Sequence, residues 1–206
     1  MTPGIDRREG FELFLLQHPS DTRVRTFLES QRLRQFSYKE VGATGGTLPS
    51  GYQHDHNRIR LGQGPEIYEH TATALRNWKH FDLGWVKLLP ANAPIVVGSV
   101  VAVLVHHLAF WSLNACRIVY VIEEEREVRK FGFAYGTLPD HAESGEERFT
   151  IEWHSSDDSV WYDILAFSRP NKAAAKLGFP VTRMLQRRFA RDSLAAMLSY
   201  VTKREN

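Results

Sequence analysis

The sequence predicts an α+β fold in which a curved antiparallel sheet of about seven strands wraps on a long C-terminal helix. Six β-like runs between residues 83 and 168 follow one another with turn residues between them, which indicates an antiparallel meander. A long amphipathic helix comes after the last run, and it is the only long element that can cover one face of that sheet. At 206 residues and 43% hydrophobic content, the chain can form one domain with a substantial core.

Residues 1–40 are expected to form an N-terminal helical extension. A helix begins near Ser20 or Asp21, either of which can cap it, and apolar residues recur near helical spacing up to about residue 35. The glycine-rich stretch 42–51 lacks the Lys-Ser/Thr step and the following helix of a phosphate-binding loop, so it is interpreted as a connector. The compact domain is therefore assigned to residues 41–206.

The remaining elements follow from local signals. Residues 52–61 can form a strand, and Gly64-Pro65-Glu66 marks the start of a helix that extends to about Phe81. Six strands are expected at 83–89, 98–107, 112–123, 128–136, 147–154 and 159–168. Gly178 and Pro180 interrupt the helical tail, which places its long helix at about 180–202. Space that side chains leave unfilled between this sheet and this helix would form a pocket.

Several long motifs resemble a known family. They include YQHDHNRIRLGQG (52–64), FGFAYGTLPDHAESGEERFTIEW (131–153) and VWYDILAFSRP (160–170). Over about residues 36–200 the chain is similar to an uncharacterised family of domains of unknown function in bacteria and plants, which looks START-like (the SRPBCC or helix-grip superfamily). The resemblance implies a helix-grip fold with a hydrophobic cavity, and it implies no reaction and no catalytic residue.

Composition excludes several classes of protein. The single cysteine, Cys116, cannot form an internal disulfide or a zinc site of several thiolates, and it favours a reducing compartment. The formal net charge of +2 gives no reason to expect nucleic acid as a partner. The apolar stretch 94–113 contains His106, His107 and Gly98, so two buried strands are expected there and not a membrane span. We expect a soluble, cytoplasmic protein without integral membrane association, and the composition leaves its oligomeric state open.

Three polar residues interrupt apolar strands and are candidates for catalysis. If strands 147–154 and 159–168 pair across a four-residue loop, Glu152 and Asp163 share one face of the sheet. Two neighbouring carboxylates in a low dielectric raise the pKa of one of them, which suits a general acid, and Arg117 could neutralise one or hold an anionic ligand. The alternative is a structural ion-pair network on an outer face.

Aromatic residues suggest the wall of a ligand cavity. Phe131, Phe133 and Tyr135 alternate along one strand, and Trp153 and Tyr162 can continue the same face on neighbouring strands. The alternative is a filled core. The candidate ligand-binding residues are therefore Arg117, Phe133, Tyr135, Glu152, Trp153, Tyr162 and Asp163.

His54 and His56 would point to the same face of a strand, which is a spacing that can chelate a metal ion. No third ligand is adjacent in the sequence, so solvated histidines on an edge strand are the alternative. No metal and no cofactor is expected.

The C-terminal tail is basic. Residues 171–206 hold eight Lys or Arg against two Asp or Glu, a net charge of +6 that leaves −4 of the total +2 on residues 1–170. Helical spacing predicts that Val181, Leu185, Met197 and Val201 pack on the sheet while Arg183, Arg187 and Arg191 lie in solvent.

Three functional hypotheses follow. The first is a soluble protein that binds an apolar or amphipathic small molecule between the sheet and the C-terminal helix. The second is a cofactor-free enzyme, such as an acid–base cyclase or dehydratase, that uses Glu152, Asp163 and Arg117 in that cavity. The third is an interaction module that uses the basic C-terminal helix.

Overall fold

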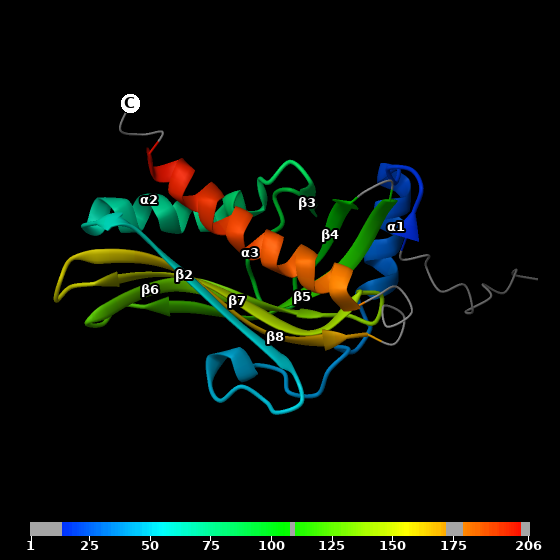
Figure 1. Ribbon diagram of the computed structural model, residues 1–206, viewed down its shortest axis with the longest axis horizontal. Helices are drawn as coiled ribbons and strands as arrows, with labels where there is room; N and C mark the ends of the chain where they lie inside the picture. The colour runs from blue at the N-terminus through cyan, green and yellow to red at the C-terminus, as the bar shows by residue number, and fades with distance from the viewer. Residues whose placement is uncertain (1–13, 108–109, 172–178, 203–206) are drawn as a thin grey trace, which may run out of the picture.

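The computed structural model describes residues 14–107, 110–171 and 179–202, in which one curved antiparallel sheet dominates (Figure 1). Its strands are β1 (Phe14–Leu15), β2 (Gln53–Gln63), β3 (Val86–Leu89), β4 (Val100–His107), β5 (Phe110–Glu124), β6 (Val128–Thr137), β7 (Glu143–His154) and β8 (Ser159–Pro170). They pair in the order β2-β8-β7-β6-β5-β4-β3, and β1 pairs with the start of β5. Each of these pairings is antiparallel, as the alternation of runs and turns predicted.

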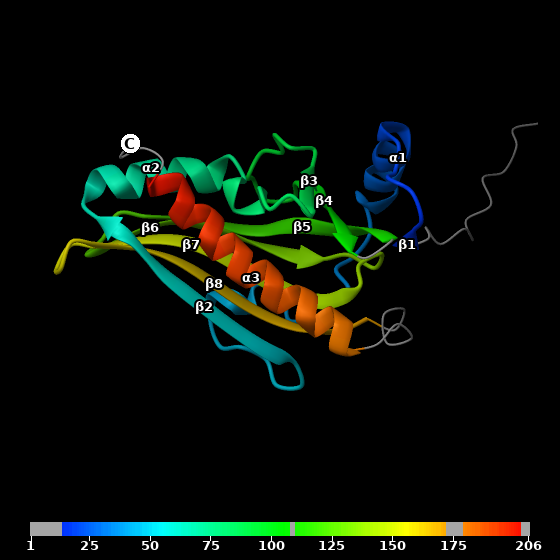
Figure 2. The same cartoon turned by 45° about the horizontal axis from the view of Figure 1, so that its top comes forward.

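The helices are α1 (Asp21–Gln31), α2 (Pro65–Arg76) and α3 (Phe179–Thr202), with 3-10 turns η1 (Ala43–Gly45) and η2 (Lys79–Phe81). Helix α3 runs diagonally over one face of the sheet and contacts β2, β8, α2 and η2 (Figure 2). We call the face under α2 and α3 the inner face and the opposite one the outer face. The prediction of a curved antiparallel sheet on a long C-terminal helix is confirmed, and this is the helix-grip arrangement. Among the described residues, no helix has both the length and the hydropathy that a membrane span requires.

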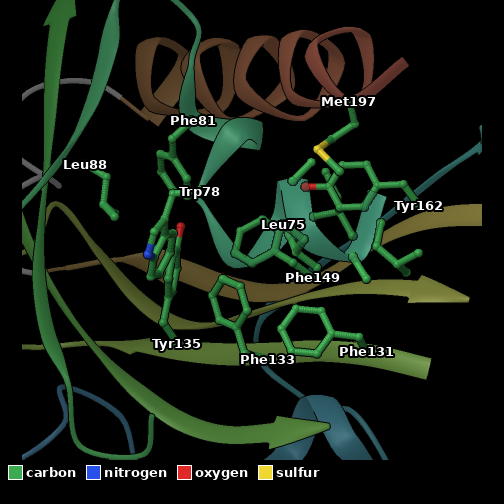
Figure 3. Close-up of a cluster of buried hydrophobic side chains, with 14 of the residues drawn as sticks. Leu75, Trp78, Phe81, Leu88, Phe131, Phe133, Tyr135, Phe149, Tyr162 and Met197 are labelled. Atoms are coloured by element: carbon green, nitrogen blue, oxygen red, sulfur yellow. The ribbon is translucent and has the colours of Figure 1, made fainter. Parts of the chain in front are cut away.

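The inner face carries the main hydrophobic core. Residues 131, 133 and 135 of β6 share this face, and residues 151 and 162 continue it on β7 and β8, as strand alternation predicted. The side chains that gather there include Leu75, Trp78, Phe81, Phe131, Phe133, Phe149, Tyr162 and Met197 (Figure 3). Met197 of α3 has no solvent exposure, so the helix closes this end of the core.

The N-terminal segment packs on the outer face. Phe27 of α1 belongs to a second apolar cluster with Leu104 of β4. Further along the chain, the buried carboxylate of Glu146 accepts hydrogen bonds from the Tyr38 hydroxyl (2.7 Å) and the Thr44 backbone N–H (3.0 Å). Burial and this carboxylate raise the pKa of Tyr38 well above its ordinary value. The division of the chain at residues 40 and 41 stays a prediction.

Candidate functional site

A cavity of about 750 Å³ lies between the inner face of the sheet and α3. Its wall includes Val103 and Val105 of β4, Trp85 immediately before β3, and Leu185 and Phe189 of α3. This volume is within the range of about 300–1,000 Å³ that is typical of small-molecule pockets. The cavity is therefore large enough for an organic ligand.

The cavity exists because successive residues on the inner face become smaller along the strands. On β8 the inner-facing residues run from Tyr162 through Ile164 to Ala166 and Ser168, and only the last three line the cavity. On β7 the same face passes through Gly145, where a Cβ atom would overlap the backbone of Phe167 in the next strand. Large aromatics thus fill one end of the inner face, and small residues leave the other end open.

Two glutamates of β7, Glu143 and Glu147, line the cavity on either side of Gly145. The Tyr135 hydroxyl donates a hydrogen bond to Oε2 of Glu147 at 2.8 Å. Burial raises the pKa of Glu147 to about 7; the bond from Tyr135 opposes this shift and the charge of Asp55 adds to it. Burial also raises the pKa of Glu143 to about 7, against opposing hydrogen bonds and the charge of Arg183. Both carboxyl groups can therefore exchange a proton near neutral pH.

An ion pair joins the same region of the cavity to α3. The Arg183 guanidinium donates to both carboxylate oxygens of Asp55 on β2, at 2.6 and 2.8 Å. Its Nη1 also donates to Gln186 (2.7 Å), whose amide in turn donates to Ser168 on β8 (2.8 Å). The pair fixes the N-terminal half of α3 to the edge of the sheet.

The prediction that Arg183 lies in solvent was wrong, because its side chain is only 14% exposed. Helical periodicity places Arg183 correctly on a polar side of α3, but the edge strand β2 brings Asp55 within reach of it. Arg187 and Arg191 are exposed, as predicted. The prediction that Val181 packs on the sheet was wrong: it is 41% exposed and lines the cavity, where the sheet is not in contact with the helix.

Two further polar side chains of the cavity wall form hydrogen bonds with backbone groups. Nδ1 of His141 accepts a hydrogen bond from the Glu143 backbone N–H at 2.9 Å, and burial lowers the pKa of His141 to about 4. Asn114 accepts from the Ala142 backbone N–H (3.1 Å) and donates to the Val103 carbonyl (3.3 Å). A neutral His141 adds no positive charge near the two glutamates.

Comparison with known proteins identifies the family of this chain. The model of a family described as "Domain of unknown function (DUF1990)" matches residues 37–196. The chain belongs to the DUF1990 family. It is 37% identical to a "UPF0548 protein" of Dictyostelium discoideum over 94% of this chain and 98% of that protein. It is 34% identical to a "UPF0548 protein" of Deinococcus radiodurans over 87% and 94%, respectively.

Two solved structures are similar to this chain at low sequence identity. A hypothetical protein from Helicobacter pylori is 8% identical with a TM-score of 0.49, covering 82% of this chain and 97% of that one. Human STARD10 is 12% identical with a TM-score of 0.44, covering 91% and 81%. The assignment of this DUF1990 chain to the START-like, helix-grip type rests on its own strand order and on the position of α3.

The structure brings only one of the seven predicted ligand-binding residues to the cavity of this DUF1990 chain, namely Tyr135. Phe133 and Tyr162 share its face but are fully buried in the core, where the Tyr162 hydroxyl is 3.0 Å from the Ser193 hydroxyl. Trp153 lies at the far end of β7 and donates to Asp158. The shared face was predicted correctly, but these three residues lie beyond the point where the inner face opens.

The carboxylates Glu152 and Asp163 share a face, as predicted, but it is the outer face. Glu152 is paired with Arg58 (2.7 Å) and Lys130 (3.1 Å). Burial alone would raise the pKa of Glu152, and the bonds and charges of these partners together lower it. The placement of Glu152 and Asp163 in the cavity was therefore wrong, and an ion-pair network accounts for their position.

Arg117 also lies on the outer face, away from the cavity. Its guanidinium donates to the backbone carbonyls of Gln31 (3.0 Å) and Arg32 (2.7 Å) at the C-terminal end of α1. Unpaired carbonyls and a partial negative charge accumulate at the end of a helix, so an arginine is stabilising there. Arg117 attaches α1 to the sheet and does not contact the cavity.

The histidine pair points to the outer face. Nε2 of His54 lies 2.8 Å from the Pro49 carbonyl, and Nε2 of His56 lies 2.6 Å from the Asp163 carboxylate. Across the described parts of the chain, no three His, Cys, Asp or Glu side chains come together as metal ligands.

Glu143 escaped prediction because it precedes the strand predicted at 147–154, whereas Glu147 is the first residue of that strand and was not considered as a candidate. Strand β7 begins at Glu143, four residues before the predicted start. The alternation of Phe149 and Ile151 with polar residues, extended towards the N-terminus, would have placed Glu147 and Glu143 on the inner face. That periodicity was the available signal.

Proposed function

We propose that this chain binds an apolar or amphipathic small molecule in the cavity between the inner face and α3. The observation that carries the proposal is a cavity of about 750 Å³ whose wall is mainly apolar. Water gains little by entering such a space, so burial of apolar ligand surface there is favourable. Val103, Val105 and Phe189 supply apolar contacts, and the two glutamates of β7 are among the polar groups of the wall.

The test fills the cavity. Ala166 lines the cavity on β8, so Ala166→Phe should occupy part of its volume. The neutral probe N-phenyl-1-naphthylamine, which fluoresces in apolar surroundings, should bind the full chain and bind the variant about tenfold more weakly. Ala195→Phe adds the same bulk at an exposed position of α3 and serves as the control. Equal probe binding by all three proteins would refute the proposal.

A second function, acid–base catalysis in the same cavity, is favoured by one observation. Glu147 has a pKa of about 7 and faces apolar surroundings, which suits a general base near neutral pH. The neutral compound 5-nitrobenzisoxazole tests this: a base removes its ring C–H proton, the electron pair forms the nitrile, and the N–O bond breaks to release a phenolate. Turnover should rise with pH through about 7 and be lost in Glu147→Gln. Glu127→Gln, which removes an exposed carboxylate, is the control. If Glu147→Gln converts the compound as fast as Glu127→Gln does, Glu147 is not the base.

A further inference from the structure

The charges in the cavity are unevenly compensated. Asp55 is neutralised by its bidentate contact with Arg183. Glu147 has the Tyr135 hydroxyl as its partner, which supplies a hydrogen bond but no charge. The charge of Arg183 also acts on Glu143 and opposes the rise of its pKa. Within the described residues, Glu147 is therefore the cavity carboxylate that has a hydroxyl and no cation as its partner.

The other charged groups of the cavity wall do not change this balance. Arg187 and Arg191 lie on α3 and are exposed to solvent, and Arg191 contacts Asp192. Burial disfavours the charged forms of His141 and of His107 on β4, so the pKa of each is lowered. The carboxylate of Glu146 is bonded to Tyr38 and Thr44 on the outer face. Ionising a buried carboxylate that has no nearby cation costs free energy. A positively charged ligand offsets this cost, so the cavity favours binding of a cation.

Glu147 and the valines of the cavity wall are on different strands. Glu147 lies on β7, three positions in the sheet order from Val103 and Val105 of β4, with polar residues such as Asn114 of β5 between them. A ligand that spans the cavity therefore contacts the Glu147 carboxylate and the apolar side chains of β4 and α3.

We propose that the ligand is an amphipathic cation: a molecule whose protonated amine contacts the carboxylate of Glu147 and whose apolar body contacts β4 and Phe189. This inference rests on the proposed function, because it names the chemical class that the same cavity selects. Glu143 and Glu147 share a face of β7 but lie four residues, about 13 Å, apart along the strand, so the ammonium group is assigned to Glu147. An ammonium group donates hydrogen bonds and accepts none, which matches the ionised carboxylate of Glu147.

The experiment compares three probes with the same hydrocarbon chain: decylamine, decanol and decanoate. Each displaces N-phenyl-1-naphthylamine from the full chain at pH 8, where decylamine is protonated and decanoate is ionised. Decylamine should bind about tenfold more tightly than decanol, and decanoate should bind most weakly. Decylamine affinity should fall between pH 8 and pH 5 as Glu147 takes up a proton, while decanol affinity should stay constant.

An isosteric variant locates the effect. Glu147→Gln should weaken decylamine binding about tenfold and leave decanol binding within about twofold. Glu127→Gln, which removes an exposed carboxylate, should alter neither. If a cavity variant does not fold, the pH dependence of the unsubstituted chain supplies the same test.

The outcomes separate this inference from the proposed function. If decanol binds as tightly as decylamine, the cavity binds apolar molecules without selecting a cation, and the inference is overturned alone. If decanoate binds most tightly, an arginine of α3 contacts the head group and the inference is also overturned. If no probe binds the chain, the proposed function fails as well.

Discussion

Replacing Glu147 with glutamine removes a charge from the cavity and keeps the shape of the side chain. Burial raises the pKa of Glu147 to about 7 from an ordinary value of 4.5. The folded chain therefore binds this proton more tightly than the unfolded chain does. The contribution of Glu147 to the free energy of unfolding accordingly falls as pH rises from about 4.5 to about 7, and stays low above that range.

The magnitude follows from the two pKa values. One pH unit corresponds to about 1.4 kcal/mol, so the difference between 4.5 and about 7 amounts to roughly 3 kcal/mol. Water that enters the cavity reduces this cost, so we expect Glu147→Gln to raise the free energy of unfolding by about 2–3 kcal/mol at pH 8. At pH 5 the folded wild type is protonated at Glu147, and the gain should shrink to below about 1 kcal/mol.

Urea unfolding followed by tryptophan fluorescence measures both values, at pH 5 and at pH 8. Glu127→Gln is the control, since its carboxylate is exposed and should give the same small difference at both pH values. A variant that is less stable than wild type at pH 8 would mean that a partner stabilises the ionised carboxylate. A stability difference that does not change with pH would refute the assignment of a raised pKa to burial.

Three further substitutions test the packing on the two faces of the sheet. Met197→Asp places an unpaired charge at a site without solvent exposure and should prevent folding, whereas Arg187→Gln should shift the melting temperature by less than about 2 °C in a circular dichroism melt. The reverse order would contradict the position of α3. In Gly136→Ala the new Cβ atom would overlap the Tyr38 ring and displace its hydroxyl from Glu146, which should cost about 1–3 kcal/mol in urea unfolding. This loss should largely disappear in a Tyr38→Ala background, and an equal loss in both backgrounds would disprove the contact.

Local patterns in the sequence determine most of the architecture. The alternation of residues 131, 133 and 135 places their rings on one face of β6 whatever the rest of the chain does, because side-chain direction has a period of two. Turn residues between 155 and 158 set the pairing that puts Glu152 and Asp163 on a common face. Such features depend on neighbours in the chain, so they can be predicted without coordinates.

Only the tertiary structure decides which face of the sheet is the inner one and where that face stops being filled. In the sequence, Glu152 and Asp163 resemble a catalytic pair. In the structure they form ion pairs on the outer face, because α3 and the cavity lie on the opposite face of the sheet. The contact of Arg183 with Asp55 joins residues 128 positions apart, and no local pattern predicts it. The ionisation of Glu143 and Glu147 depends on burial under α3. A pKa is set by surrounding dielectric and charge, which the fold assembles from distant segments of the chain.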